Sequence, residues 1–368
     1  MTQLLFEIGT EEIPASYIQP ALAFIEKTAQ AQLKELGLSF GAVRTVGTPR
    51  RLTLAIDALQ ERQEDRCQEH IGPPTMAAFD ADGQPTKAAQ GFARSRGVAV
   101  EDLQVVETKK GAYLMAVEEI KGQETSVLLS DLLDNLLRSI PFPTSMRWAN
   151  SSMSFARPLQ WLLALYNGKV IDLTVEGVQA GTTTRGHRFM GTEPVAVQNF
   201  DHYQEALASQ FVLVDQQTRR EAVVETVKKA VQERVGDKGQ PVLDKGLIDT
   251  VTNLVEIPWG ICGSFDEKFL ALPDEALITS MREHQKYFPV RDSQGKLLPF
   301  FVAVNNTDIK DPVMAANGHE RVLRARLEDG LFFFHEDKKQ SLADRVADLS
   351  GIIFQRKLGT MAEKSERL

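Results

Sequence analysis

Residues 4–14 read LLFEIGTEEIP, and this stretch sets the architecture of the N-terminal region. The apolar run over residues 4–8 is typical of a β-strand, and Gly9 ends it. Apolar residues then recur at helical spacing over residues 16–36, which predicts an amphipathic helix. The chain therefore opens as a strand, a turn and a long helix.

The turn carries two carboxylates, Glu11 and Glu12, whose role could be structural or chemical. Thr10 and the acidic pair are typical of a helix start, because negative charge there complements the helix dipole. Pro14 suits a first helical turn, where its missing N–H costs nothing. Acid–base catalysis would need a partner group that the sequence does not reveal. We expect the pair to start the helix.

The rest of the chain alternates short strands with separate helical blocks. A hairpin is predicted from residues 159–166 and 169–175, turning at Asn167-Gly168. Further strands are expected at 43–46, 52–59 and 112–120, in PWGICGSF, in HQKYFPV and in KLLPFFVAVNN, and helices at 87–96, 124–140, 216–235, 243–255 and from Gly318 onward. This mixture predicts an α+β fold with mostly antiparallel, β-rich modules.

We expect three parts along the chain. Residues 1–192 would form an α+β N-terminal module, and residues 193–283 a mainly helical module inserted after it. Residues 284–368 would form a strand pair followed by a helical C-terminal segment. A length of 368 residues is sufficient for two or three domains, each with its own core.

Composition indicates an ordinary globular protein, with 43% hydrophobic and 25% charged residues. No stretch is apolar over the length of a membrane span, and the N-terminal apolar run is too short for a signal peptide. These features predict a cytoplasmic protein without a membrane partner. Cys67 and Cys262 are far apart and lack metal-ligand spacing, so we expect two reduced thiols.

Sequence motifs for catalysis are absent. The chain has no phosphate-binding G-x-x-x-x-G-K-[ST] loop, no G-x-G-x-x-G, no H-E-x-x-H, no C-x-x-C and no G-x-S-x-G. Its six histidines are scattered, without a spacing that would put two on one helix face. We therefore assign no catalytic residue and no metal ligand in this chain.

Arginines beside turns and aromatic residues are the positive signal. An arginine at a rigid turn can present its guanidinium to a phosphate, and a neighbouring aromatic ring can stack on an unpaired base. The candidate nucleic-acid contacts are Arg50, Arg51, Arg147, Trp148, Arg157, Arg185, His187 and Arg188. The alternative is that these cations pair with some of the fifty acidic residues. The net charge of −8 is not that of a typical nucleic-acid binder, although phosphate contacts depend on local patches.

The segment GHERVLRARLEDGLFFF, residues 318–334, can be interpreted in two ways. Its arginines could form a row that faces a ligand. Its apolar positions instead favour a core helix with a charged outer face, in which Arg324 and Glu328 pair at i, i+4. We expect the core helix, with Phe332, Phe333 and Phe334 buried.

Several segments together resemble one protein family. FEIGTEEIP, TPRRL, KAAQGFAR, MRW, FARPLQWL, RGHRFM, HQKYFPV, VLRARLEDGLFF and LGTMAEK occur in this order, from Leu5 to about Lys364. This series is similar to the beta subunit of bacterial glycyl-tRNA synthetase. Members of that family continue beyond this length, through an HD-type helical domain and an anticodon-binding domain. The resemblance therefore covers the N-terminal part, and anticodon reading is not assigned to it.

The resemblance implies that two different subunits carry out different parts of the reaction. A separate alpha subunit carries the class II catalytic core for glycine, with ATP and Mg²⁺, while the beta subunit handles tRNA. We expect this chain to bind no cofactor, to partner the alpha subunit and glycine tRNA, and to bind no DNA. The candidate arginines would be positioning cations that hold the acceptor arm for the alpha subunit.

Two other functions compete with this expectation. The chain could be a scaffold that holds the alpha dimer, with the tRNA contacts made by the absent C-terminal domains. A hydrolytic editing activity around His187 or His284 is disfavoured, because no nucleophile–base pair is evident and glycine leaves little for a size-based sieve to remove.

Overall fold

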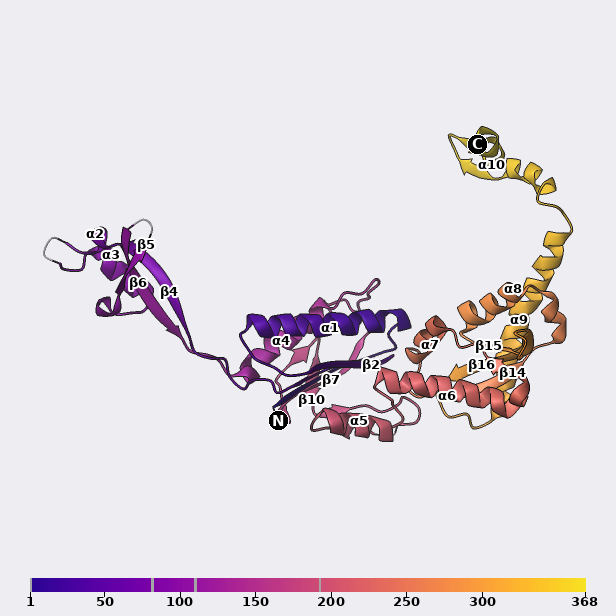
Figure 1. Cartoon of the computed structure of the whole chain (residues 1–368), viewed down its shortest axis with the longest axis horizontal. Coiled ribbons are helices and arrows are strands. Elements are labelled where there is room, and N and C mark those ends of the chain that lie inside the picture. The colour runs from indigo at the N-terminus through magenta and orange to yellow at the C-terminus, as the bar shows by residue number, and fades with distance from the viewer. Residues whose placement is uncertain (1, 81–82, 109–110, 192) are drawn as a thin grey trace.

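The computed structural model describes residues 2–80, 83–108, 111–191 and 193–368. Figure 1 shows an elongated molecule with a projecting arm at one end, a central sheet and a second sheet with its helices at the other end. Helices and mostly antiparallel sheets form separate blocks, so the α+β prediction is confirmed. The three-part division of the chain stays a prediction.

The central sheet contains the N-terminal strand as an interior member. Its strands are β1 (Gln3–Thr10), β2 (Val43–Thr48), β3 (Arg51–Asp57), β7 (Leu159–Tyr166), β8 (Lys169–Val170), β9 (Thr174–Val175) and β10 (Val178–Gly181). The order is β2-β3-β1-β7-β10-β9, with β8 on β7, and only the β10–β7 pair is parallel. Asn167 and Gly168 both have positive φ, as a two-residue hairpin turn requires, which confirms the predicted turn after β7.

The two faces of the central sheet pack against different helices. Because side chains alternate along a strand, Leu4, Phe6 and Ile8 of β1 face α1 (Ala15–Glu35) and α4 (Thr125–Ser139). Leu5 faces the opposite side, where α5 (Phe200–Ser209) lies. Figure 1 shows α1 and α5 on opposite sides of the sheet. Glu7 shares the α5 face with Leu5, and this places a carboxylate inside the protein.

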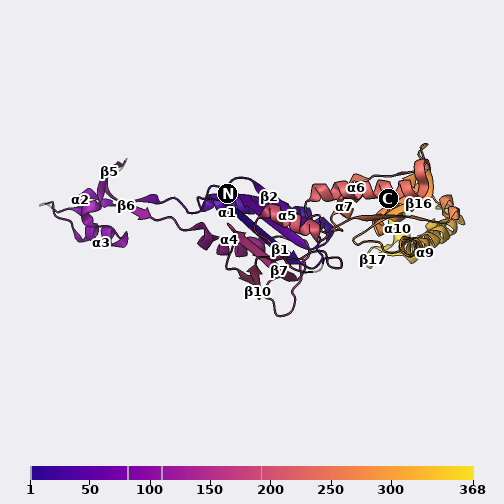
Figure 2. The ribbon, with the colours of Figure 1, turned by 90° about the horizontal axis from the view of Figure 1, so that it is seen from below.

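An arm leaves the central sheet between β3 and α4. It consists of β4 (Arg66–Pro74), α2 (Thr75–Ala78), α3 (Lys87–Ser95), a 3₁₀ turn (Val100–Asp102), β5 (Gln104–Thr108) and β6 (Gly111–Ile120), with strand order β4-β6-β5. Figures 1 and 2 both place it away from the other elements. Its core is small: among the described residues of the arm, the buried hydrophobic ones are Ala78, Ala89, Ala93, Leu114 and Ala116.

The second sheet has helices on both faces. Its strands, in the order β13-β15-β16-β14, are β13 (Gln240–Pro241), β15 (Phe288–Arg291), β16 (Leu297–Asn305) and β14 (Trp259–Ser264). Helices α6 (Gln216–Val235) and α7 (Lys245–Thr252) pack on one face. On the other face lie α8 (Asp274–Thr279), a 3₁₀ turn (Glu267–Ala271), a π-helical turn (Ser280–Gln285) and α9 (Pro312–Lys338).

The C-terminal segment differs from the expectation at its aromatic run. Phe332 and Phe333 are 58% and 62% exposed, because α9 continues beyond the second sheet and no element of the described part of the chain buries these rings. After α9 come a 3₁₀ helix (Asp344–Gly351), β17 (Ile353–Gln355), β18 (Gly359–Thr360) and α10 (Met361–Arg367). The remaining short elements are β11 (Thr183–Thr184), β12 (Val195–Ala196) and a 3₁₀ turn (Gly236–Lys238). Over the described residues, no helix is long and apolar enough to cross a membrane.

Candidate functional site

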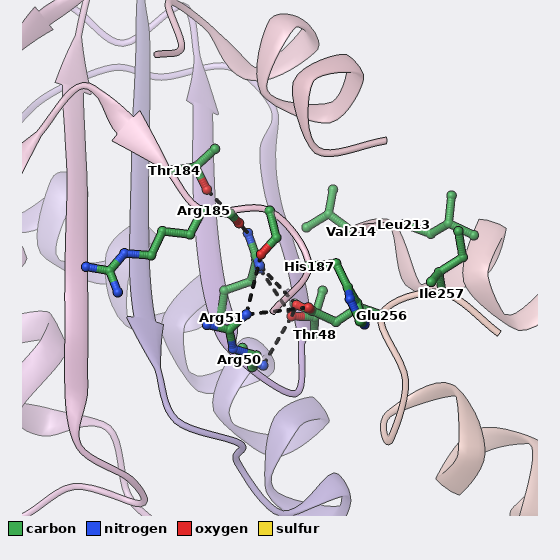
Figure 3. Close-up of polar contacts among 12 residues, drawn as sticks. Thr48, Arg50, Arg51, Thr184, Arg185, His187, Leu213, Val214, Glu256 and Ile257 are labelled. Atoms are coloured by element: carbon green, nitrogen blue, oxygen red, sulfur yellow. Dashed lines mark hydrogen bonds and ion pairs between the residues drawn. The ribbon is translucent and has the colours of Figure 1, made fainter. Parts of the chain in front are cut away.

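Four segments that are distant in sequence converge at one end of the central sheet. They are β1, the turn between β2 and β3, the segment 182–191 and the loop 253–258 that leads into β14. Figure 3 shows the side chains of Thr48, Arg51 and Glu256 pointing toward one another, while the guanidinium of Arg185 points away from them. The convergence joins the central sheet to the second sheet through side chains rather than through shared strands.

Arg51 is the centre of this network. It is fully buried, and its Nη1 lies 3.2 Å from Glu7 Oε1 while its Nη2 lies 3.0 Å from Glu256 Oε1. It also donates to the hydroxyls of Thr48 and Thr184, at 3.3 Å each, and to the carbonyl of Arg185 at 2.7 Å. Burial alone would lower the pKa of Arg51, but the carboxylates of Glu256 and Glu7 outweigh it and raise the pKa. Arg51 is therefore a permanent buried cation.

Glu256 supplies the matching negative charge. It lies in the loop that leads into β14, on the second sheet's side of the junction between the two sheets. It is fully buried and accepts a hydrogen bond of 2.7 Å from Thr48 Oγ1 in addition to that from Arg51. Arg50 Nη1 lies 4.0 Å from its second oxygen. Burial would raise the pKa of Glu256, but Arg51 and the Thr48 hydroxyl lower it below the ordinary glutamate value. The carboxylate is thus held ionised inside the protein.

A second buried arginine strengthens the junction. Arg219, near the start of α6, donates to the carbonyl of Gly47 at 2.7 Å and to that of Thr252 at 2.8 Å. It also donates to the carbonyls of Leu213 and Val214. Burial lowers the pKa of Arg219 to about 10, so it still carries its charge at neutral pH. Arg219 therefore connects the end of β2 to the chain just before α6 and to the last residue of α7.

The segment TRGHRF, residues 184–189, rests on this network. The Arg185 carbonyl accepts from Arg51, the Gly186 carbonyl accepts from Arg50 at 3.4 Å, and the His187 N–H donates to Gln210 at 2.9 Å. The His187 side chain is buried, and its Nδ1 accepts the backbone N–H groups of Phe189 and Met190, each at 3.3 Å. These two hydrogen bonds fold the backbone around the imidazole, so the His187 side chain shapes the loop.

Three guanidinium groups surround the ring of Trp161 on β7. The carbon of each guanidinium lies 5.1–5.5 Å from the ring centroid, for Arg185, Arg51 and Arg50. This spacing is that of cation–π contacts, which favour cations over an aromatic face. The ring also lies over Gly9 of β1, where an added Cβ would come within 2.0 Å of two ring atoms. Glycine is therefore required at this position by packing.

The carboxylate pair of the opening stretch does not start the helix. Helix α1 begins at Ala15 after Pro14, has no acidic residue in its first turn and receives no side-chain cap. Glu11 and Glu12 instead form ion pairs with Arg188, the Glu12 pair at 2.9 Å. The prediction is wrong because the N–H groups of Thr10 and Glu11 donate to the carbonyls of Arg50 and Pro158, so backbone pairing with neighbouring segments continues to Glu11 and α1 begins only at Ala15.

The other predicted residues lie in the loop 140–158, outside the buried network. Arg147 is exposed, and Trp148 packs partly against the core beneath the α1 face. Arg157 is half-buried and donates to the carbonyl of Ala156 at 2.9 Å. The structure thus brings together Arg50, Arg51, Arg185 and His187, with Arg188 at the rim, and leaves Arg147, Trp148 and Arg157 apart.

Several members of the network were missed by the sequence analysis. Glu7 sits in an otherwise apolar strand, where a charged residue signals a buried partner. Tyr203 donates to Glu7 at 3.1 Å, and Glu256 and Arg219 come from a part of the chain that the motifs did not highlight. Among the described residues, no group of three or more His, Cys, Asp or Glu side chains could hold a metal ion. The hydrogen bonds from Arg51 and Arg50 to the carbonyls of Arg185 and Gly186 show that the network holds this loop in place.

The lowered pKa of Glu256 predicts a pH-dependent contribution to stability. The folded state binds fewer protons than the unfolded state, so the contribution is complete above the unfolded pKa of about 4.3 and is lost as the pH falls through the lower folded pKa. We expect Glu256→Gln to cost about 1–3 kcal/mol at neutral pH. The difference from wild type should shrink below about pH 4. Urea unfolding across a pH series measures it, and a difference that persists unchanged into acid would contradict it.

Comparisons with known proteins find matches that cover nearly the whole length of this chain. The family model described as "Glycyl-tRNA synthetase beta subunit" matches residues 4–368. The glycine–tRNA ligase beta subunits of Syntrophus aciditrophicus and Trichlorobacter lovleyi are each 47% identical, over 99% of this chain and over 52% and 53% of their own lengths. That of Desulfatibacillum aliphaticivorans is 47% identical over 100% of the chain and 53% of its own length. The chain spans about half the length of these curated relatives, and it belongs to the glycyl-tRNA synthetase beta subunit family.

Proposed function

We propose that this chain is the tRNA-binding and subunit-interface part of a glycyl-tRNA synthetase beta subunit. In this proposal the alpha subunit binds ATP and Mg²⁺ and attaches glycine to its tRNA in the cytoplasm. The chain contributes by positioning, holding the acceptor arm so that its terminal adenosine meets the activated glycine. Positioning of this kind needs fixed cations and no acid–base group in the chain itself.

The observation that carries the proposal is the anchored loop 185–190. It presents the guanidinium of Arg185, which is exposed, and the ring of Phe189, which is 78% exposed. Beneath them, Arg51 and Arg50 hold the backbone of the same loop. A loop held from beneath that carries both an exposed cation and an exposed aromatic ring suits RNA, where phosphate contacts position the ligand and unpaired bases stack.

The arginines divide into two roles. Arg50 and Arg51 have little or no exposed surface, so they act as positioning residues that support the loop from within. Arg185 faces solvent, while Arg188 is partly exposed and bound to Glu11 and Glu12. Exposed ion pairs contribute little free energy, so a phosphate could replace these carboxylates at small cost. Arg147, Trp148 and Arg157 remain proposed contacts for a more distant part of the same RNA.

Replacing Arg185 with alanine is expected to weaken binding of a glycine tRNA acceptor-arm minihelix. Loss of one phosphate contact should raise Kd about 5–10-fold and reduce the slope of log K against log salt by about one. Fluorescence anisotropy across a salt series measures both quantities. Lys228→Ala is the matched control, because Lys228 is an exposed cation on α6, outside the loop. Equal affinities and slopes for the two variants would contradict the assignment.

A scaffold function is the second candidate, and the C-terminal segment favours it. Phe332, Phe333 and Ile353 are 58–74% exposed, which is typical of a surface that another chain covers. If the chain binds no minihelix even at low salt while it still binds the alpha subunit, the scaffold function is correct and the tRNA-binding role is wrong.

A further inference from the structure

Strand β14 has an open edge. In the second sheet β14 pairs with β16 alone, and its other side has no strand partner among the described residues. An unpaired edge presents backbone donors and acceptors that can template another chain, so proteins normally cover it or use it. The question is which groups of this edge are still open.

Two side chains already cap the ends of the edge. The Gly260 N–H donates to Thr226 Oγ1 of α6, and the Ser264 N–H donates to Glu320 Oε1 of α9, each at 2.8 Å. In an antiparallel ladder alternate residues point their backbone groups away from the paired strand. Cys262 lies midway between these two residues, so its N–H and C=O also face away from β16. In the described part of the chain, no group accepts from this N–H.

A cleft of about 540 Å³ runs along this open edge, between α6 and α9. The α9 side is mostly apolar, with Ile309, Val313 and Ala316. The α6 side presents Arg234, for which the described residues offer no hydrogen-bonded or ion-paired carboxylate. The cleft therefore combines an open backbone edge, an apolar wall and an unpaired cation.

We propose that an extended segment of the alpha subunit binds in this cleft as a fifth strand beside β14. Its backbone would pair with Cys262, an apolar side chain would pack against Val313 and Ala316, and a carboxylate would pair with Arg234. Peptides that add to a sheet edge are recognised in this way, by main-chain hydrogen bonds and alternate side chains. This inference rests on the proposed role of the chain as a subunit interface.

The geometry disfavours a second copy of this chain as the occupant. The edge lies at the bottom of a cleft flanked by α6 and α9, and the β14 edge of a second copy is flanked by the same two helices. In such a pairing, helix would meet helix before the two edges reached the spacing of about 4.8 Å that strand pairing needs. A single extended segment has no such flanks and fits.

Hydrogen–deuterium exchange with the purified alpha subunit tests the proposal. We expect the Cys262 amide to exchange at least about tenfold more slowly in the complex, because an added strand protects it. Val313→Arg fills the cleft from an exposed position of α9, since Val313 lines the cleft and is 71% exposed, so it should weaken alpha-subunit binding at least about tenfold and abolish the protection. Met314→Arg is the matched control: Met314 lies on the same helix, is 71% exposed and does not line the cleft.

The possible outcomes distinguish a failure of the strand addition from a failure of the proposed subunit-interface role. Complex formation without added protection at Cys262, or equal binding by the two arginine variants, overturns the strand addition and leaves the interface role intact. If the wild-type chain forms no complex with the alpha subunit, both are wrong. Protection that rises with the concentration of this chain alone identifies a second copy as the occupant and overturns the proposal. Minihelix binding is measured separately and does not depend on this site.

Discussion

Replacing Arg51 with alanine is expected to lower the free energy of unfolding by about 3–5 kcal/mol, because it leaves two carboxylates buried without their cation. Glu7 and Glu256 are both fully buried and lie 3.2 and 3.0 Å from the guanidinium of Arg51. The carbonyl of Arg185 also loses its donor, so the loop 185–190 should loosen. Guanidinium chloride unfolding at neutral pH measures the stability.

Two further variants serve as comparisons for the stability loss of Arg51→Ala. Arg51→Lys keeps the charge but cannot reach the same set of acceptors, so we expect a smaller loss than with alanine. Arg220 of α6 is partly exposed and pairs with Asp249 of α7, so Arg220→Ala should cost at most about 1 kcal/mol. If Arg51→Ala were no more destabilising than Arg220→Ala, the buried network would not stabilise the junction.

Gly9→Ala is expected to destabilise the protein by about 3 kcal/mol, the upper end of the usual range for overpacking. The added Cβ would lie 2.0 Å from two ring atoms of Trp161. The ring has little freedom to move, because Arg50, Arg51 and Arg185 lie around it. Thermal unfolding followed by tryptophan fluorescence measures the stability.

Another glycine of the same chain provides the control. Gly91 lies on an exposed face of α3, and an added Cβ there meets nothing within 4 Å. Gly91→Ala should therefore be neutral or stabilise by up to about 1 kcal/mol, through the helix propensity of alanine. A melting temperature for Gly9→Ala that equals that of Gly91→Ala would contradict the packing argument.

Local patterns predicted the elements better than the site. The periodicity over residues 216–235 predicted α6 correctly, and Asn167-Gly168 marked the hairpin, because both signals depend on neighbouring residues. The arginines of the turn after β2 were also identified, but as ligands of an external phosphate. Their partner Glu256 lies 205 residues from Arg51 in the sequence, and no short-range pattern can predict an ion pair across that sequence separation.

The position of Glu256 has a consequence for how the molecule unfolds. The residue belongs to the chain segment that leads into β14, yet its charge is neutralised inside the central sheet. Pulling the two sheets apart would leave Glu256 as an unpaired anion in half-open apolar surroundings, while Arg51 would keep its pair with Glu7, and this is a state of high free energy. The two sheets therefore share one cooperative transition. The arm, whose buried hydrophobic residues in the described part of the chain are four alanines and one leucine, lies outside that transition and can open on its own while the rest stays folded.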